Sequence, residues 1–255
     1  MRIEFIFAAV IGIWTACSHS AASAQEPIEV DAANVLTSMS QFLGGLKKFS
    51  AKYDTDLDII TPHGQKLKLV SSGNVLVSRP GQLSITRSGT LADVKFNLDS
   101  GILTIFGLKL DGYVQFPAKT IDEAITRVRE DVGFSAPGAD MISAKPFDMD
   151  LTDIVSGRHI GMTTIGGESV HHLAFRGSKL DWQLWVKDGT EPFPLKYVIT
   201  SKLQAGAPEY SLRLTGWNSK PDIVENSFTF TPSATAKKLT GIAIDETGTI
   251  ISTWE

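Results

Sequence analysis

The chain has 255 residues, a formal net charge of −4 at pH 7 and a single cysteine. This mild acidity argues against nucleic-acid binding, which requires a basic stripe. One cysteine allows no disulfide within the chain, and a length of about 230 residues after a leader is enough for one all-β core.

Residues 1–24 have the pattern of an export signal. The apolar run at residues 5–14 is too short to span a membrane, and Ala22-Ser23-Ala24 fits the small-x-small cleavage rule. We therefore expect a mature periplasmic chain that begins at Gln25 and has no membrane-spanning segment. Lipid attachment at Cys17 is disfavoured, because Trp14 stands where a lipobox needs an aliphatic residue.

The first element after the signal is a helix within residues 28–49. Its apolar residues recur three and four positions apart, and Gly44-Gly45 predicts a kink or early fraying. Packing against a sheet is the simpler interpretation of this helix. A movable helix that covers a cavity is the alternative.

A series of strands follows the helix. In residues 51–60, Ala51, Tyr53, Leu57 and Ile59 face one way and alternate with charged residues, and a turn leads to residues 65–70, whose lysines can face the aspartates of the first run. A turn at residues 72–74 is expected to separate this hairpin from the next strand. Further strands are predicted at 75–78, 83–87, 94–98, 102–106 and 108–116.

The middle of the chain interrupts the strands. Thr120 to Glu123 form a capping box, which predicts a helix that runs to Val132 and is ended by Gly133. Residues 134–156 are expected to be loop or short helix and are the natural place for a lid or plug.

Strands resume at residue 158 and form an antiparallel meander over residues 170–200. Trp182, Leu184 and Val186 share one face of its central strand, so the meander has one buried surface. A short last strand is predicted at 228–232. Residues 240–255 form a tail to which the pattern assigns no role.

The sequence contains no convincing catalytic or metal-binding motif. His171 and His172 are adjacent, and on a strand they point to opposite faces, so together they cannot chelate one metal ion. Gly-x-Ser-x-Gly, P-loop and Gly-x-Gly-x-x-Gly patterns are missing from the sequence. We therefore expect no enzyme activity, no cofactor and no metal. A hydrolase would have to arise from residues that only the fold brings together.

Four short patches, in order along the chain, resemble the LolA and LolB outer-membrane lipoprotein-carrier superfamily. They are Phe49-Ser50-Ala51-Lys52-Tyr53, Ser78-Arg79-Pro80-Gly81-Gln82-Leu83, Trp185-Val186 with Asp188-Gly189 running to Pro194-Leu195-Lys196, and Ser227-Phe228-Thr229-Phe230-Thr231-Pro232. The run from Asp181 to Trp185 and the strand from His171 to Phe175 look closer still to a family of predicted periplasmic proteins of unknown function with that fold.

This resemblance implies a mainly β fold with helices (α+β). The expected architecture is a curved antiparallel half-barrel over residues 25–239 with helices covering its concave face, followed by the tail at 240–255. In the carriers the concave interior holds acyl chains, and the arginine of the Arg-Pro turn helps to hold the lid helices. By motif that residue is Arg79.

The function expected on this basis is binding of a lipid, acyl chain or other hydrophobic ligand in the half-barrel, as part of envelope lipid or lipoprotein handling. The expected ligand-binding residues are Arg79, Leu57, Val77, Ile85, Phe96 and Trp182. A non-enzymatic module for protein interaction or sensing, with a packed interior, is the alternative. Envelope proteins therefore stay open as partners.

Overall fold

The computed structural model describes residues 28–91, 93–147, 154–245 and 247–254. The elements in chain order are α1 (Val30–Gly45), β1 (Lys48–Ile60), β2 (Lys66–Ser78), β3 (Gln82–Gly89), β4 (Asp93–Asp99), β5 (Ile102–Gly107), β6 (Gly112–Pro117), α2 (Ile121–Glu130), the 3₁₀ turn η1 (Ala139–Met141), β7 (Ile154–Ile165), β8 (Glu168–Gly177), β9 (Leu180–Lys187), β10 (Pro194–Ser201), β11 (Glu209–Asn218), β12 (Lys237–Lys238), β13 (Gly241–Ile244) and β14 (Ile250–Trp254).

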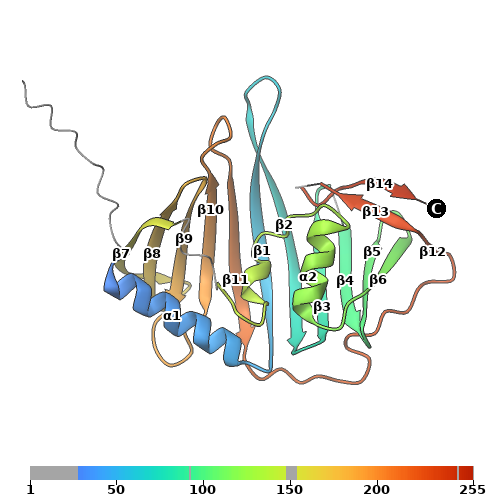
Figure 1. Ribbon diagram of the computed structural model, residues 1–255, viewed down its shortest axis with the longest axis horizontal. Coiled ribbons are helices and arrows are strands. Elements are labelled where there is room, and N and C mark those ends of the chain that lie inside the picture. The colour runs from blue at the N-terminus through green and yellow to red at the C-terminus, as the bar shows by residue number, and fades with distance from the viewer. Residues whose placement is uncertain (1–27, 92, 148–153, 246, 255) are drawn as a thin grey trace, which may run out of the picture.

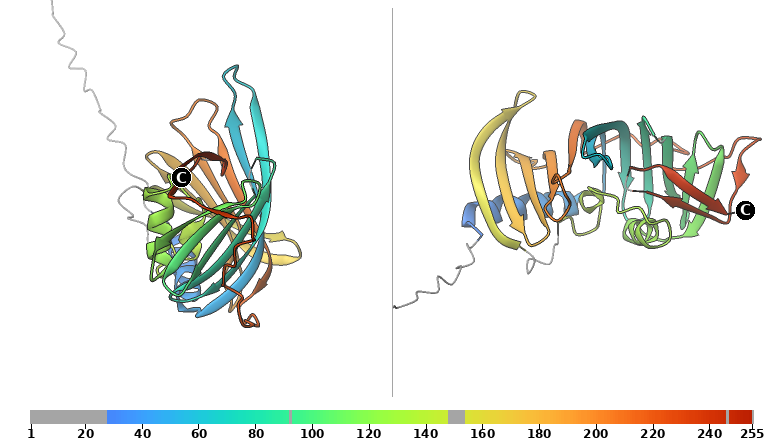
Figure 2. Two further views of the ribbon diagram at one scale, coloured as in Figure 1. Left: turned by 90° about the vertical axis from the view of Figure 1, so that its right-hand side faces the viewer. Right: turned by 90° about the horizontal axis from the view of Figure 1, so that it is seen from above.

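One large sheet carries the fold. Its strand order is β12-β6-β5-β4-β3-β2-β1-β11-β10-β9-β8-β7, and its neighbouring strands are antiparallel apart from the short β12–β6 pair. The sheet is open and curved, and Figures 1 and 2 show that α1 crosses β7 to β11 while α2 lies over β2 to β4 on the same concave side. This confirms the expected α+β half-barrel with helices on its concave face.

Strand alternation places the core between the sheet and these covers. Trp182, Leu184 and Val186 of β9 are each at most 3 % exposed, as their shared face predicts. The covers contribute buried residues at helical spacing, Met39 and Leu43 from α1 among them.

Both helices agree with the sequence signals, although they are shorter than expected. α1 ends at Gly45, where the glycine pair predicted fraying. The Thr120 hydroxyl accepts a hydrogen bond from the Glu123 amide at 3.1 Å, and Glu123 Oε2 accepts one from the Lys119 amide. The capping box therefore forms, with its return bond one residue earlier than in the standard pattern.

The predicted turn at residues 72–74 is wrong, because β2 runs without a break from Lys66 to Ser78. Gly73 is in the strand for a packing reason. A Cβ at this position would lie 2.6 Å from the Tyr53 ring and 1.9 Å from the Thr86 carbonyl oxygen. The glycine thus allows a close approach between neighbouring strands rather than a turn.

Two other strand predictions need correction. Residues 108–111 form a turn, and the strand begins only at Gly112. Residues 228–232 form no strand, and their contacts with β4 to β6 are made by side chains and by the Phe228 carbonyl group. Asn97 Nδ2 donates to the Phe228 carbonyl oxygen at 3.0 Å, and the Phe230 ring packs 5.1 Å from the Tyr113 ring.

The C-terminal segment folds back onto the concave side as the antiparallel pair β13–β14 (Figures 1 and 2). Ile242 and Ile244 are buried in the main core, and the Ile244 amide donates to the Val132 carbonyl oxygen at 3.0 Å. The boundary at residues 239/240 stays a prediction, but these residues pack as a further cover beside α2.

Candidate ligand cavity

A cavity of about 160 Å³ lies between the sheet and its covers. Its walls come from β1 to β5, β10, β11, both helices and the segment after α2. The lining residues are Leu43, Phe49, Ala51, Tyr53, Thr55, Leu57, Val75, Leu83, Ile85, Arg87, Phe96, Leu103, Ala124, Ile125, Val128, Phe134, Ala136, Pro137, Gly138, Ala139, Met141, Ile142, Pro194, Tyr210, Leu212, Leu214 and Trp217. Nearly all of these side chains are apolar, so the cavity favours an apolar occupant.

Strand geometry explains why these residues share the cavity. Every second residue of β1 from Phe49 to Leu57 lines it, because successive side chains of a strand point to opposite faces. Val75, Ile85 and Phe96 lie opposite one another in register on β2, β3 and β4, so one row of side chains forms the floor.

The structure brings together three of the six residues expected from the sequence. Leu57, Ile85 and Phe96 line the cavity. Val77 is fully buried opposite Phe49 in the packed core and does not line it. Whether any of these side chains contacts a ligand stays a prediction.

Trp182 lies in a different part of the concave face. Its ring stacks on Phe175 at 4.0 Å between centroids and also packs against Phe147 and Tyr197. These aromatic rings fill the space between β8–β10 and the covers. The sheet therefore has a filled half around Trp182 and a hollow half around Ile85.

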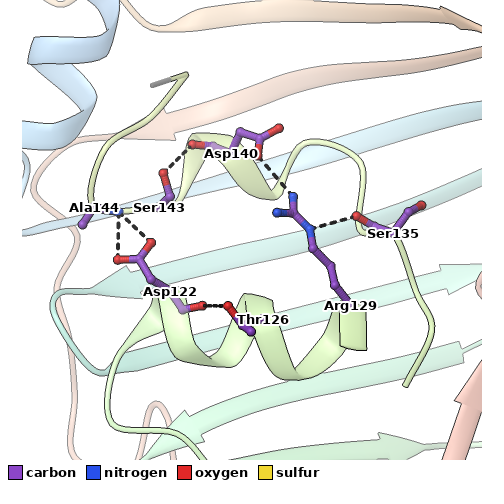
Figure 3. Close-up of polar contacts among 7 residues, drawn as sticks. All are labelled: Asp122, Thr126, Arg129, Ser135, Asp140, Ser143 and Ala144. Carbon is purple, nitrogen blue, oxygen red and sulfur yellow. Dashed lines mark hydrogen bonds and ion pairs between the residues drawn. The ribbon is translucent and has the colours of Figure 1, made fainter. Parts of the chain in front are cut away.

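The cover over the hollow half is a connected unit. Asp122 at the start of α2 accepts hydrogen bonds from the Ala144 amide at 3.1 and 3.4 Å, and Arg129 donates to Asp140 at 3.2 Å and to the Ser135 carbonyl oxygen at 3.3 Å (Figure 3). Both side chains of the Arg129–Asp140 pair are 43 % exposed, so this ion pair adds little stability. These contacts hold α2 and the segment after it together.

Arg79 joins this cover to α1 and the sheet. Its guanidinium donates to the carbonyl oxygens of Leu46, Ile142 and Ser143 at 3.2, 3.1 and 2.6 Å. Its Cζ lies 5.5 Å from the centre of the Phe49 ring. Burial lowers the pKa of Arg79, while the charge of Asp122 opposes that effect. The position agrees with the lid-holding role that the resemblance implied, and retention of cargo stays a prediction.

Four residues of the cavity wall that carry hydroxyl or guanidinium groups were absent from the expected set. They are Tyr53, Thr55, Arg87 and Tyr210. Arg87 follows Leu83 and Ile85 at a spacing of two, so strand alternation alone could have placed it on the inner face. Burial raises the pKa of Tyr53 to about 12 and raises the pKa of Tyr210, so both phenols stay protonated near neutral pH.

The two adjacent histidines lie on opposite faces, as expected. His172 stacks on Trp185 at 4.2 Å and bonds Gln183. His171 joins His159 at 3.0 Å and Asp188 at 3.2 Å in a chain of hydrogen bonds. Within the described residues no group of three or more His, Cys, Asp or Glu side chains is arranged to hold a metal ion.

An open, curved antiparallel sheet whose covers enclose an apolar cavity defines the class of half-barrel proteins. Residues 32–240 match a family described as "Predicted periplasmic protein (DUF2092)", and the chain belongs to this family. The description agrees with the expected periplasmic localisation, whereas the proposed signal at residues 1–24 lies outside the described residues. No helix in the described ranges is long and apolar enough to cross a membrane.

The chain is also similar to several solved structures at low identity. An uncharacterized conserved protein from Thermus thermophilus matches with 11 % identity and a TM-score of 0.48, over 82 % of this chain and 99 % of that one. LprF from Mycobacterium bovis matches with 12 % identity and a TM-score of 0.45, over 80 % and 100 %. A LolA superfamily protein from Nitrosomonas europaea matches with 11 % identity and a TM-score of 0.41, over 78 % and 97 %. No curated protein matches the chain.

Proposed function

We propose that this protein is a non-catalytic periplasmic binding protein that holds an apolar ligand, such as the acyl chain of a lipid, in the cavity of the hollow half. The observation that carries the proposal is the apolar lining around about 160 Å³ of space. Each methylene group moved from water into such a site contributes about 0.8 kcal/mol.

The size of the cavity sets a limit on its occupant. An engineered apolar cavity of about 150 Å³ stays dry and binds benzene, so the present space fits about six carbon atoms. A longer chain requires the cover to move away from the sheet. The cover is suited to such movement because exposed polar contacts hold much of it (Figure 3).

A second function is supported by the filled half of the sheet. The rings of Phe147, Phe175, Trp182 and Tyr197 pack against one another in the interior there, as expected for an interaction module with a packed interior. Native mass spectrometry of protein purified from its own envelope separates the two functions. Co-purified lipid supports binding in the cavity, and a stoichiometric protein partner without lipid supports the interaction module.

Filling the cavity provides the direct test. Ile85→Phe places a larger side chain in the cavity wall and is expected to weaken binding of 1-octanol by about fourfold, because it removes space for roughly one methylene group. Titration calorimetry on the delipidated protein gives the affinities, and thermal melting shows that the variant folds.

Ile199→Phe is the matched control. Ile199 is partly buried against the same core but does not line the cavity, so octanol affinity should stay at the wild-type value. Equal affinities for wild type and both variants would refute binding at this site.

A further inference from the structure

Arg87 is the only charged side chain among the described residues that line the cavity. It is half-buried at the end of β3, on the same face as Leu83 and Ile85. A guanidinium keeps its charge at every physiological pH, so this end of an otherwise apolar cavity is permanently positive.

The contacts of Arg87 with the described residues are to neutral groups. Nε and Nη2 donate to the Ser71 hydroxyl at 3.2 and 3.0 Å, and Cζ lies 5.9 Å from the centre of the Phe134 ring. Among the described residues no carboxylate forms an ion pair with Arg87. The Nη1 hydrogens likewise have no acceptor in that part of the chain, and a charge next to apolar surface favours a counter-charge.

Two phenols share this end of the cavity. In register, Tyr53 and Arg87 lie on either side of Gly73, and Tyr210 lines the same cavity. Burial raises the pKa of both phenols, and the Arg87 charge opposes the rise. The Tyr53 hydroxyl donates to the Thr86 carbonyl oxygen at 2.8 Å. The Tyr210 hydroxyl has no hydrogen-bond partner among the described residues and is free to donate to a ligand.

Gly248, between β13 and β14, lies against the Arg87 guanidinium from the other side. A Cβ on Gly248 would lie 1.5 Å from Nη1, so only a glycine allows the backbone to pass here. Asp245 in the same turn is engaged elsewhere, because its Oδ1 accepts the Thr247 and Thr249 amides at 2.9 Å each. The positive end is therefore partly shielded from water, which strengthens its attraction for an anion.

From this arrangement we infer that the ligand is an anionic amphiphile, whose apolar tail occupies the cavity and whose carboxylate or phosphate head binds Arg87 and the Tyr210 hydroxyl. This inference rests on the proposed function and adds the chemical class of the ligand. Carboxylate and phosphate both match the planar fork of a guanidinium. The site therefore requires a negatively charged head group, and the experiment must distinguish a carboxylate from a phosphate.

Four probes with the same eight-carbon tail test the inference on the delipidated wild-type protein. These are octanoate, octyl phosphate, 1-octanol and octylammonium, each titrated by calorimetry. At least one anion is expected to bind about tenfold more tightly than octanol, because its head forms charge-assisted hydrogen bonds where the alcohol forms only neutral ones. Octylammonium is expected to bind most weakly. A preference for octyl phosphate over octanoate identifies a phosphate head, and the reverse identifies a carboxylate.

Arg87→Gln should abolish the preference for the anions, so that octanoate and octyl phosphate no longer bind more tightly than octanol to the variant. Arg213→Gln is the matched control, because Arg213 is exposed and alternates with Leu212 and Leu214, so it points away from the cavity. The wild-type comparison needs no variant, so a poorly folded Arg87→Gln protein does not prevent the test.

The outcomes separate the two proposals. If octanol binds and the four head groups make no difference, the inference about Arg87 is overturned and cavity binding stands. If Arg87→Gln retains the anion preference, the head group lies elsewhere and the inference is overturned. If none of the probes binds, both proposals are overturned.

Discussion

Single side chains decide how the cover is attached to the sheet. Arg79 reaches three carbonyl oxygens that belong to the end of α1 and to the segment after α2. Arginine suits this position because its five N–H donors project in a fixed fork, whereas lysine has a flexible point charge. One residue thus links elements that are distant in the sequence.

Arg79→Met keeps an apolar stem of similar length and removes all the N–H donors. We expect a loss of about 1–3 kcal/mol in the free energy of unfolding, because partly buried carbonyl groups lose their donors. Hydrogen exchange should also accelerate at the amides of α2 and of Ala139–Met141. Hydrogen-exchange mass spectrometry and urea unfolding give both quantities.

Arg176→Met serves as the control, since Arg176 is exposed on β8. Its unfolding free energy should change by less than about 0.5 kcal/mol. If amide hydrogen exchange in α2 and Ala139–Met141 of Arg79→Met is as slow as in the wild type, Arg79 does not hold the cover.

Among the elements, the β1–β2 hairpin pairs its charges across the strands. Asp58 lies opposite Lys68 in register, and its carboxylate is 2.8 Å from Lys68 and 3.4 Å from Lys66. The Asp58 side chain is 4 % exposed, whereas the side chains of Lys66 and Lys68 are 46 % and 53 % exposed. The prediction that aspartates of β1 face lysines of β2 is therefore confirmed at Asp58, whose carboxylate is buried while the two lysines are exposed.

This pairing makes the hairpin sensitive to acid. Burial by itself would raise the pKa of Asp58, but hydrogen bonds from Lys68 and from the Glu209 amide outweigh it, so the folded-state pKa is lowered. A lowered pKa stabilises the fold above the unfolded value of about 3.9. That contribution is lost as the pH falls through the folded-state pKa.

Asp58→Asn is accordingly expected to lower the free energy of unfolding at pH 7, and the difference from wild type should shrink as the pH falls from 7 to below the unfolded-state pKa of about 3.9. Urea unfolding across this pH range measures the effect. Asp222→Asn, at an exposed loop position, should follow the wild-type curve. A constant difference between Asp58→Asn and wild type at all pH values would contradict the linkage.

On the scale of the whole molecule, the sheet is open and its two halves differ. β7 lies at one edge, where Ile28 makes a bridge to Gly157, and the short β12 pairs with β6 at the other. Such additions protect edges that would otherwise pair with other chains. The helices α1 and α2 and the β13–β14 pair cover the concave side (Figure 2).

The C-terminal pair can be tested as part of the core. Ile242→Ala removes a fully buried side chain and should lower the free energy of unfolding by about 2–5 kcal/mol. Ile251→Ala, in the same strand pair but 64 % exposed, should change it by less than about 0.5 kcal/mol. If both variants change the free energy of unfolding by the same small amount in urea unfolding, the C-terminal pair is not packed into the core.

Local patterns in the sequence determine the elements and the faces of the strands. Alternation places Leu57, Ile85 and Phe96 inward, and the capping box marks the start of α2, because these signals depend on residues close together in the chain. The same alternation extends to Arg87, so the sequence alone could have predicted that its charged side chain points inward. It cannot explain Gly73, whose strand position depends on the ring of Tyr53 from a neighbouring strand.

Only the tertiary structure decides which part of the concave face is hollow. Trp182 and Ile85 are equally good inward residues by pattern, yet Trp182 meets Phe147 and Phe175 while Ile85 faces open space. Filling depends on the summed volumes of side chains from strands and covers far apart in the sequence. For the same reason, the approach of Gly248 to Arg87 exists only in the folded chain.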